Sequence, residues 1–543
     1  MTLRKFLLSA CGAVVLLGAA AGPAAAGSLS FTPPQQLPHG NPQAHPYYSG
    51  GEPSIAFDPS GDGHVYVTAP QGIPAVVGAV AGADASQGVA FWGSADHALS
   101  FPTFQNTGSA IGGGDSDVAV LPDQHHTVLV ADLEAVAAAI CTSQDFGQTF
   151  SDCNGGLATN QQGPENDREW LTPGTKPGEV YLTYHDFAAG FPIIERSSDG
   201  GQTFTPCGTI IDPSGPAAQT YTPQGGTLVS KPIVAPDGTV YVEFTTPDQT
   251  ASPVGAALNH LYMAVAKGGC TGQTVFTDYV IYQDPGASLA NIFQQTARDA
   301  GGTLYVLTAG KTKAGQDPAR VWLFTSTDDG KTWAPPIAAP MPNQKAAVFP
   351  TIAGGQGRGE AILGWFGTDT SNDPNTTTNE WRYYAAATYD GGRTFNVATV
   401  TPDAIHYGDI CTQGIFCGLV PGQPGNRNLA DFASAAIDPS SGCAALAIPG
   451  DPYNRPDQPN GADNGTSSAY VALQKDQRTC FTPANAGKDA SHVPARAKRK
   501  LKAAGRCATA RRRKHSPTRR SSHSSCRSTR RASKHHSRKR SGR

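Results

Sequence analysis

Short apolar segments recur along the chain, each bounded by clusters of Gly, Pro, Asp and Ser. The pattern is clearest in three-residue runs with a central tyrosine, at 65–67, 180–182, 240–242 and 304–306. β-Branched and aromatic residues favour strands, and apolar runs of this length between turn residues are typical of strands rather than helices. With few charged residues and no heptad repeat, the pattern predicts an all-β chain.

Between these runs lies an octapeptide, Ser/Thr-x-Asp-x-Gly-x-Thr-aromatic, in four full copies. Its fixed positions are Ser143, Asp145, Gly147 and Thr149; Ser197, Asp199, Gly201 and Thr203; Ser326, Asp328, Gly330 and Thr332; and Thr388, Asp390, Gly392 and Thr394. A degenerate copy starts at Ser94, with Ala98 in place of the glycine. Asp accepts backbone hydrogen bonds in turns and Gly allows positive φ, so each copy predicts a tight hairpin turn. The aromatic residue would pack between neighbouring sheets.

The octapeptide resembles the Asp-box, or BNR repeat, of the sialidase-like β-propeller superfamily. The resemblance implies four-stranded blades, with each box joining the third and fourth strands on the face opposite the active site. The box aspartates would then be architectural. Blades can be started at 52–57, 117–120, 168–171, 231–234, 293–297, 349–352 and 432–437. We therefore favour a seven-bladed β-propeller, with six blades and longer loops as the alternative. Residues 31–33 repeat the strand that follows a box and would close the ring against the last blade.

The two ends of the chain differ from this body. Residues 1–26 have the basic start, apolar run and small-residue cleavage pattern of a secretory signal peptide; a lipoprotein box at Cys11 is the alternative. Residues 27–490 form the expected propeller, and residues 491–543 a disordered tail rich in Arg, Lys and Ser. We expect a secreted, extracellular or cell-surface monomer without a transmembrane span.

Eight cysteines lie in the expected propeller, and disulfides are common in exported chains. Their places relative to the boxes and strands suggest four pairs: Cys141–Cys153, Cys207–Cys270, Cys411–Cys417 and Cys443–Cys480. Sequence alone cannot fix the pairing.

The net charge of −2 conceals a strong division. Residues 496–543 hold 20 of the 41 Lys and Arg and no Asp or Glu, so the propeller itself is acidic. The expected partner of the tail is a polyanion: a wall polymer, an anionic lipid or extracellular nucleic acid. The alternative is that the tail folds back on the acidic propeller.

Polar and aromatic residues collect on the face opposite the boxes, around the central channel. The strand starts place there Glu52, Asp115, Asp117, Asp167, Arg168, Lys231, Gln294, Gln295 and Asp431; the loops add Asp132, Glu134, Tyr184, His185, Asp186, Glu243, Trp365, Asp369, Asp451 and Tyr453. Such an acidic mouth suits sugar hydroxyls, although exposed loops are polar in any case. It would also suit Ca²⁺, with Asp115, Asp117 and Asp431 as candidate ligands, while no cofactor is required.

Sialidases hold a sugar carboxylate with three arginines, the first in a Phe/Tyr-Arg-Ile-Pro motif that this chain lacks. Arg168, Arg427 and Arg455 could supply a triad, and Tyr184 or Tyr453 a nucleophile. Asp167 and Asp186 are further candidate catalytic residues. A structural network, in which Arg168 bridges blades through Asp117 or Asp167, is favoured over catalysis.

These features favour a glycan- or surface-binding module without sialidase catalysis. The alternative is an enzyme, a glycoside hydrolase of exo-α-sialidase or other type, or a lyase, that uses the acidic face.

The charge of the tail leads to a test. Deleting residues 496–543 should abolish retention of the protein on anionic polymer beads, because that segment would bind by releasing counterions. Retention of the full chain should fall linearly with the logarithm of salt concentration. Equal, salt-insensitive retention of both forms would show that the tail is not the anchor, and a large drop in melting temperature on truncation would favour folding back.

Overall fold

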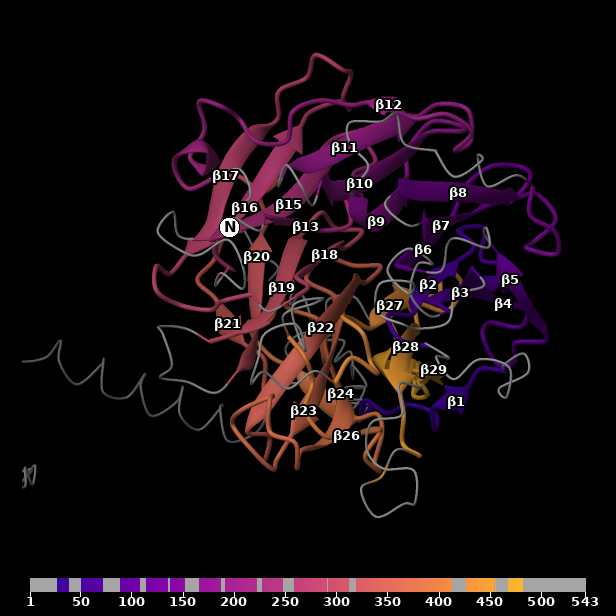
Figure 1. Ribbon diagram of the computed structural model, residues 1–543, viewed down its shortest axis with the longest axis vertical. Helices are drawn as coiled ribbons and strands as arrows, with labels where there is room; N and C mark the ends of the chain where they lie inside the picture. Colours follow the sequence, from indigo (N-terminus) through magenta and orange to yellow (C-terminus); the bar gives the residue numbers. More distant parts are fainter. Residues whose placement is uncertain are drawn as a thin grey trace, which may run out of the picture. The chain divides into compact units, whose positions relative to one another are not determined.

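The chain folds into a ring of seven antiparallel sheets, as the computed structural model shows (Figure 1). The structure describes residues 27–38, 50–71, 88–107, 114–134, 137–151, 166–186, 191–221, 227–247, 258–290, 292–311, 319–412, 426–453, 455 and 467–481. The expected signal peptide and the tail lie outside these ranges. Seven blades are confirmed, and the six-bladed alternative is wrong.

The strands run in chain order from the inner to the outer edge of most blades; in blades 4 and 6 two strands share one position, and the outermost strand of blade 7 comes from the N-terminal segment. Blade 1 contains β2 (Ser54–Phe57), β3 (Val65–Pro70), β4 (Val89–Ser94) and β5 (Thr103–Thr107). Blade 2 contains β6 (Ser116–Val120), β7 (Val128–Glu134) and β8 (Ala137–Ser143). Blade 3 contains β9 (Asn166–Pro173), β10 (Val180–Asp186), β11 (Pro192–Ser197) and β12 (Thr205–Pro206).

Blade 4 contains β13 (Leu228–Val229), β14 (Ile233–Val234), β15 (Val240–Pro247), β16 (Leu258–Ala266) and β17 (Thr277–Gln283). Blade 5 contains β18 (Gln295–Arg298), β19 (Leu304–Gly310), β20 (Arg320–Ser326) and β21 (Ile337–Ala338). Blade 6 contains β22 (Ala346–Gly354), β23 (Ala361–Thr368), β24 (Glu380–Thr388), β25 (Asn396–Thr399) and β26 (His406–Tyr407). Blade 7 contains β27 (Ser434–Ile437), β28 (Ala444–Gly450) and β29 (Ser468–Leu473), and the short 3₁₀ turns η2 (Ala217–Gln219) and η4 (Gln477–Thr479) lie between strands.

The N-terminal segment closes the ring. Strand β1 (Gln35–Gln36) pairs with β29 as the outermost strand of blade 7, and Phe31 forms a further bridge to Gln474. The strand predicted at 31–33 is therefore part of the closing segment, and it covers an edge that would otherwise expose unpaired backbone groups.

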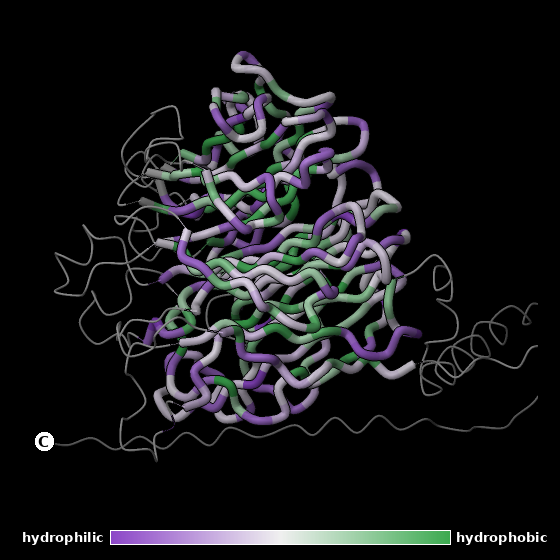
Figure 2. Tube along the Cα trace, turned by 90° about the vertical axis from the view of Figure 1, so that its right-hand side faces the viewer, coloured by the Kyte–Doolittle hydropathy of each residue, from purple (hydrophilic) through white to green (hydrophobic). Residues whose placement is uncertain are grey.

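Apolar side chains fill the spaces between neighbouring sheets. Between blades 2 and 3, Leu129 and Ile140 pack with Leu171, Leu182 and Phe204, the aromatic residue of an octapeptide. Apolar residues therefore run along the strands in the body of the ring, while hydrophilic ones gather at the turns (Figure 2). The predicted place of the octapeptide aromatic is confirmed here.

The octapeptides form the turns between third and fourth strands. In the copy at Ser197, the Asp199 carboxylate accepts hydrogen bonds from the Thr203 amide at 2.9 Å and the Thr203 hydroxyl at 2.6 Å. The Ser197 hydroxyl accepts one from the Gly201 amide at 2.9 Å. The degenerate copy repeats this geometry, with Ala98 at a φ of +63° where the others have glycine. The box aspartates thus make the hydrogen bonds within their turns that an architectural role requires.

Strand direction gives the ring two distinct faces. Because the strands alternate in direction, the turns between first and second strands lie on the same side as the octapeptides, which we call the turn face. The starts of the first strands and the connections between second and third strands lie on the other side, which we call the mouth face.

Two of the four predicted disulfides are confirmed. Cys207 is bonded to Cys270 and Cys443 to Cys480, with Cα–Cα distances of 5.1 and 4.4 Å. Cys141 and Cys411 are also disulfide-bonded, but their expected partners, Cys153 and Cys417, lie outside the described residues.

The turn geometry predicts a stability effect. Replacing Asp199 or Asp328 with Ala should lower the free energy of unfolding by about 1–2 kcal/mol, because turn donors lose their acceptor. Chemical denaturation checks this, with Asp329→Asn as the control, since the Asp329 side chain is exposed and lies 3.4 Å from Lys331 Nζ. An unchanged midpoint in both alanine variants would contradict the architectural role.

Candidate functional site

A single arginine occupies the axis of the ring. The Arg168 side chain is almost fully buried; its Nη1 lies 2.9 Å from Glu52, and its Nη2 lies 3.3 Å from Asp115 and 3.4 Å from Asp431. These acids come from the starts of blades 1, 2 and 7. Arg168 therefore joins four blades, counting its own.

A β-bulge in the innermost strand of blade 3 directs Arg168 to the axis. Trp170 pairs with Thr183 and Asp167 with His185, so Arg168 and Glu169 together oppose one residue of β10. Arg168 has a φ of +65°, which is unusual for a residue with a side chain. Bulges of this kind re-aim a side chain and often lie beside functional sites.

Aromatic rings complete the surroundings of Arg168. The centre of its guanidinium lies 4.3 Å from the Phe293 ring, 4.7 Å from the Phe432 ring and 5.8 Å from the Trp170 ring. These three residues belong to one buried apolar cluster with Leu228 and Leu258. The centre of the ring is therefore filled by the protein's own side chains.

Burial raises the pKa values of the surrounding carboxyl groups. It raises the pKa of Asp115 to about 7, against the opposing charge of Arg168, and it also raises the pKa values of Glu52 and Asp431. The pKa of Glu169 is raised further by burial and by the charge of Asp115, and neither of its carboxyl oxygens has a hydrogen-bond partner in the described structure. Groups with such shifts are candidates for acid chemistry.

A second ionic contact links blades 4 and 2. Lys231 Nζ lies 2.9 and 2.8 Å from the two carboxylate oxygens of Asp117. Asp117 also accepts hydrogen bonds from the Leu171 amide at 2.7 Å and the Ser54 hydroxyl at 2.5 Å. Its carboxylate is thus fully engaged.

The partners expected for Arg168 were wrong. Neither Asp117 nor Asp167 pairs with it, because Asp117 binds Lys231 and Asp167 lies 3.4 Å from His185 in its own blade. The bulge turns Arg168 toward the acids of blades 1, 2 and 7 instead. Its predicted bridging role is confirmed in this form.

The candidate catalytic residues do not meet at one point. Arg427 joins the axial network through Asp431, whereas Arg455 lies over the Tyr407 ring at 5.8 Å. Tyr184 is buried between blades 2 and 3, Tyr453 is exposed, and the side chain of Asp186 lies outside the described part.

The candidate Ca²⁺ ligands are each held by a cation. Asp115 and Asp431 contact Arg168, and Asp117 contacts Lys231. These three acids are therefore partners of Arg168 and Lys231, and the Ca²⁺ site stays a prediction.

An aromatic pair on the mouth face escaped the sequence analysis. Phe191 directly precedes β11 and is 46 % exposed, and its ring centre lies 5.6 Å from that of Tyr221. Tyr221 follows η2 in the connection to blade 4. Neither residue belongs to a repeated motif. The sequence therefore offers no signal for the pair beyond single aromatic residues in two connections.

Comparisons with known proteins return structural likeness alone. No family model and no curated protein matches the chain. A protein of unknown function from Dyadobacter fermentans is 11 % identical over 82 % of this chain and 98 % of its own, with a TM-score of 0.43. An ulvan lyase is 11 % identical over 84 % and 100 %, with a TM-score of 0.42, and the NanB sialidase of Streptococcus pneumoniae is 8 % identical over 82 % and 71 %, with a TM-score of 0.38. Such values carry no information about activity.

The axial network predicts a pH-dependent defect. Arg168→Met should lower stability by about 3–5 kcal/mol near pH 8, because buried carboxylates lose their counter-charge. The deficit should shrink as the pH is lowered toward 5, because Asp115, whose pKa is about 7, then takes up a proton.

The stability of the wild type should likewise fall as the pH rises. Since the folded pKa of Asp115 is raised to about 7, its contribution to stability is lost as the pH rises through that value. Melting temperatures measured across pH test both statements. The control is Arg382→Met, which removes an ion pair at the surface, where Arg382 lies 3.6 Å from Glu380. A deficit independent of pH would contradict the network.

Proposed function

We propose that the protein is a secreted propeller that binds an uncharged glycan across its mouth face. The proposal rests on the ion pairing of the cationic side chains on this face. Arg168, Arg427 and Lys231 are all engaged by carboxylates of the protein, while the Asp167 carboxylate at the rim is 31 % exposed. Such a surface favours sugar hydroxyls, which donate hydrogen bonds, over sugar carboxylates.

The rim of blade 3 offers a path for a sugar chain. Asp167 pairs with His185 on β10, and His185 pairs with Pro192 on β11, next to Phe191. With neighbouring strands about 4.8 Å apart, Asp167 and the Phe191–Tyr221 pair are separated by roughly 10 Å. Asp167 is 31 % exposed and can accept hydroxyl hydrogen bonds, while the two rings offer an apolar surface to a sugar face.

Sialic acid is a poor fit for this arrangement. A bound carboxylate needs free guanidinium groups, and the two arginines nearest the axis share Asp431 and Glu52. The lack of the Phe/Tyr-Arg-Ile-Pro motif supports the same conclusion. Several structurally similar proteins act on glycans, among them the ulvan lyase and the NanB sialidase, although their likeness is too low to carry the argument.

Export is part of the proposal. The signal-like segment 1–26 and the disulfides fit an extracellular protein. In the described part of the chain, no helix has the length and apolar character needed to cross a membrane. The basic segment 496–543 would hold the protein to a polyanion at the cell surface.

The proposal predicts which changes weaken binding. Asp167→Ala and Phe191→Ala should each reduce the affinity for a neutral oligosaccharide at least tenfold, because each removes one end of the rim path. Titration calorimetry of the mature chain, with ligands chosen from a panel of neutral and sialylated glycans, measures the change. Asp329→Asn on the turn face is the matched control. Binding of sialylated glycans only, or an equal loss in the control, would contradict the proposal.

A glycoside hydrolase is the second candidate, favoured by one observation. The pKa of Asp115 is raised to about 7 by burial, beside Asp167, so it can hold a proton for a leaving group near neutral pH. The same sugars incubated with the protein would then yield new reducing ends, at a rate that falls as the pH rises above 7. Absence of new reducing ends with any bound sugar leaves the binding function alone.

A further inference from the structure

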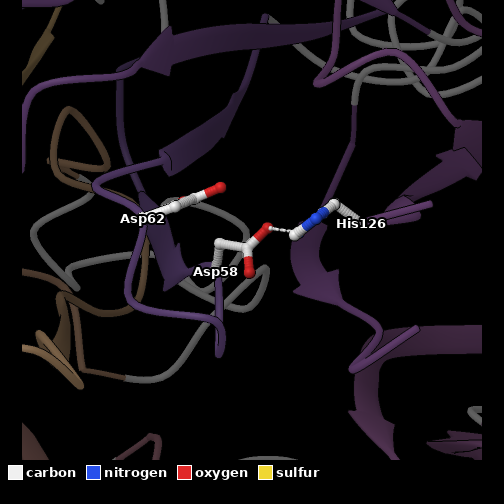
Figure 3. Close-up of side chains that lie close together, drawn as sticks. All are labelled: Asp58, Asp62 and His126. Carbon is white, nitrogen blue, oxygen red and sulfur yellow. Dashed lines mark hydrogen bonds and ion pairs between the residues drawn. The ribbon is translucent and has the colours of Figure 1, made fainter. Parts of the chain in front are cut away.

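We propose that the turn face holds a divalent metal ion of the zinc class between blades 1 and 2, with Asp58, Asp62 and His126 as ligands. One oxygen of each carboxylate and one ring nitrogen of the histidine all lie within 4.8 Å of one another. Figure 3 shows the three side chains converging from two blades. This site is separate from the mouth face and independent of the glycan proposal.

Two turns place these ligands. Asp58 and Asp62 belong to the β2–β3 turn, which is held by hydrogen bonds from the Ser60 amide to Asp58 at 2.8 Å and from the His64 amide to Asp62 at 3.0 Å. His126 lies in the β6–β7 turn of the next blade, with Nδ1 2.7 Å from an Asp58 oxygen. The two carboxylates are therefore held in place by hydrogen bonds from the backbone of their own turn.

The carboxylates of this cluster lack the arginine or lysine partners that the carboxylates at the axis have. In the described structure, the ion pairs of Asp58 and Asp62 are made with His126 and His64 alone, and neither carboxylate meets a lysine or arginine. Asp58 is almost completely buried. Two close carboxylates facing only imidazoles give a site of negative charge that a divalent cation would neutralise.

A buried hydroxyl beside the cluster supplies an independent indication. Tyr66 is fully buried, and its hydroxyl has no hydrogen-bond partner in the described part of the chain. The Tyr66 ring is stacked on the His64 ring, with ring centres 6.4 Å apart, and His64 Nδ1 lies 2.9 Å from Asp62, so the phenol lies beside the cluster. A buried hydroxyl normally has a partner. A water molecule bound to the metal ion would supply it.

The donor set indicates the kind of metal. Phe146 packs against both imidazoles, with ring-centre distances of 4.4 Å to His64 and 5.1 Å to His126, and so restricts their orientation. His64 Nδ1 lies 2.9 Å from Asp62 Oδ1, although the two atoms are not aligned for a hydrogen bond. Mixed imidazole and carboxylate ligands suit Zn²⁺ and related ions, whereas Ca²⁺ prefers oxygen alone.

The test uses the mature full-length chain and ZnCl₂. The His126→Gln and Asp62→Asn variants should bind Zn²⁺ at least tenfold more weakly at this site and lose the Zn²⁺-dependent rise in melting temperature. The matched control is His125→Gln, since His125 is the exposed neighbour in the same turn and contacts Gln124 at 3.0 Å. It should behave as wild type. Zinc bound by other histidines, including those of the tail, contributes equally to all variants. The readout is therefore the difference in Zn²⁺ response between each ligand variant and the control.

Two results would overturn the proposal. One is an equal Zn²⁺-dependent rise in melting temperature for wild type, Asp62→Asn and His126→Gln. The other is an anomalous scattering peak, in Zn²⁺-soaked crystals, that lies away from these ligands. Because Asp62 is exposed, its variant should melt like wild type without metal, which separates loss of binding from loss of folding. A CaCl₂ response as large as that to ZnCl₂ would refute the assigned class of metal.

Discussion

The structure depends on one buried cation at the centre of the ring. Arg168 contacts carboxylates from blades 1, 2 and 7 and aromatic rings from blades 3, 5 and 7, so five of the seven blades meet at this side chain. An isolated guanidinium would be far too costly to bury, and the same holds for the acids around it. Each group is tolerable only while the others stay in place. This mutual dependence fixes how the inner strands are arranged and sets the conditions for the rest of the mouth face.

The two faces treat aspartate in opposite ways. In an octapeptide, hydrogen bonds from the Thr149 hydroxyl and amide lower the pKa of Asp145 to about 2. At the axis, burial raises the pKa of Asp115 to about 7 despite the nearby Arg168. The first carboxylate is a fixed acceptor that stabilises a turn, and the second exchanges its proton near neutral pH. The same residue type therefore has a raised pKa where it is buried at the axis and a lowered pKa where it accepts hydrogen bonds in a turn.

Much of the fold could be predicted because its signals are local. The apolar runs and octapeptides encode strands and turns within a few residues, and they located all seven blades and the closing segment. Cys207–Cys270 and Cys443–Cys480 followed from that layout.

The site was less predictable because its contacts cross long stretches of sequence. Arg168 contacts Glu52 and Asp431 because a β-bulge turns its side chain toward them, and no sequence pattern predicts that bulge. The approach of Asp58 to His126 and of Phe191 to Tyr221 likewise depends on how turns from different blades come together.

The lengths of the connections indicate where this propeller can vary. On the turn face, the connection from β2 to β3 runs only from Asp58 to His64, and its polar groups are held by internal hydrogen bonds. On the mouth face, β3 ends at Pro70 and β4 begins only at Val89. Since the axis is filled, a ligand on the mouth face must be recognised by residues at the rim and in these longer connections. Ligand preference can then change with the connections while the buried network and the octapeptides keep the ring intact, because connections tolerate sequence change better than the elements they join.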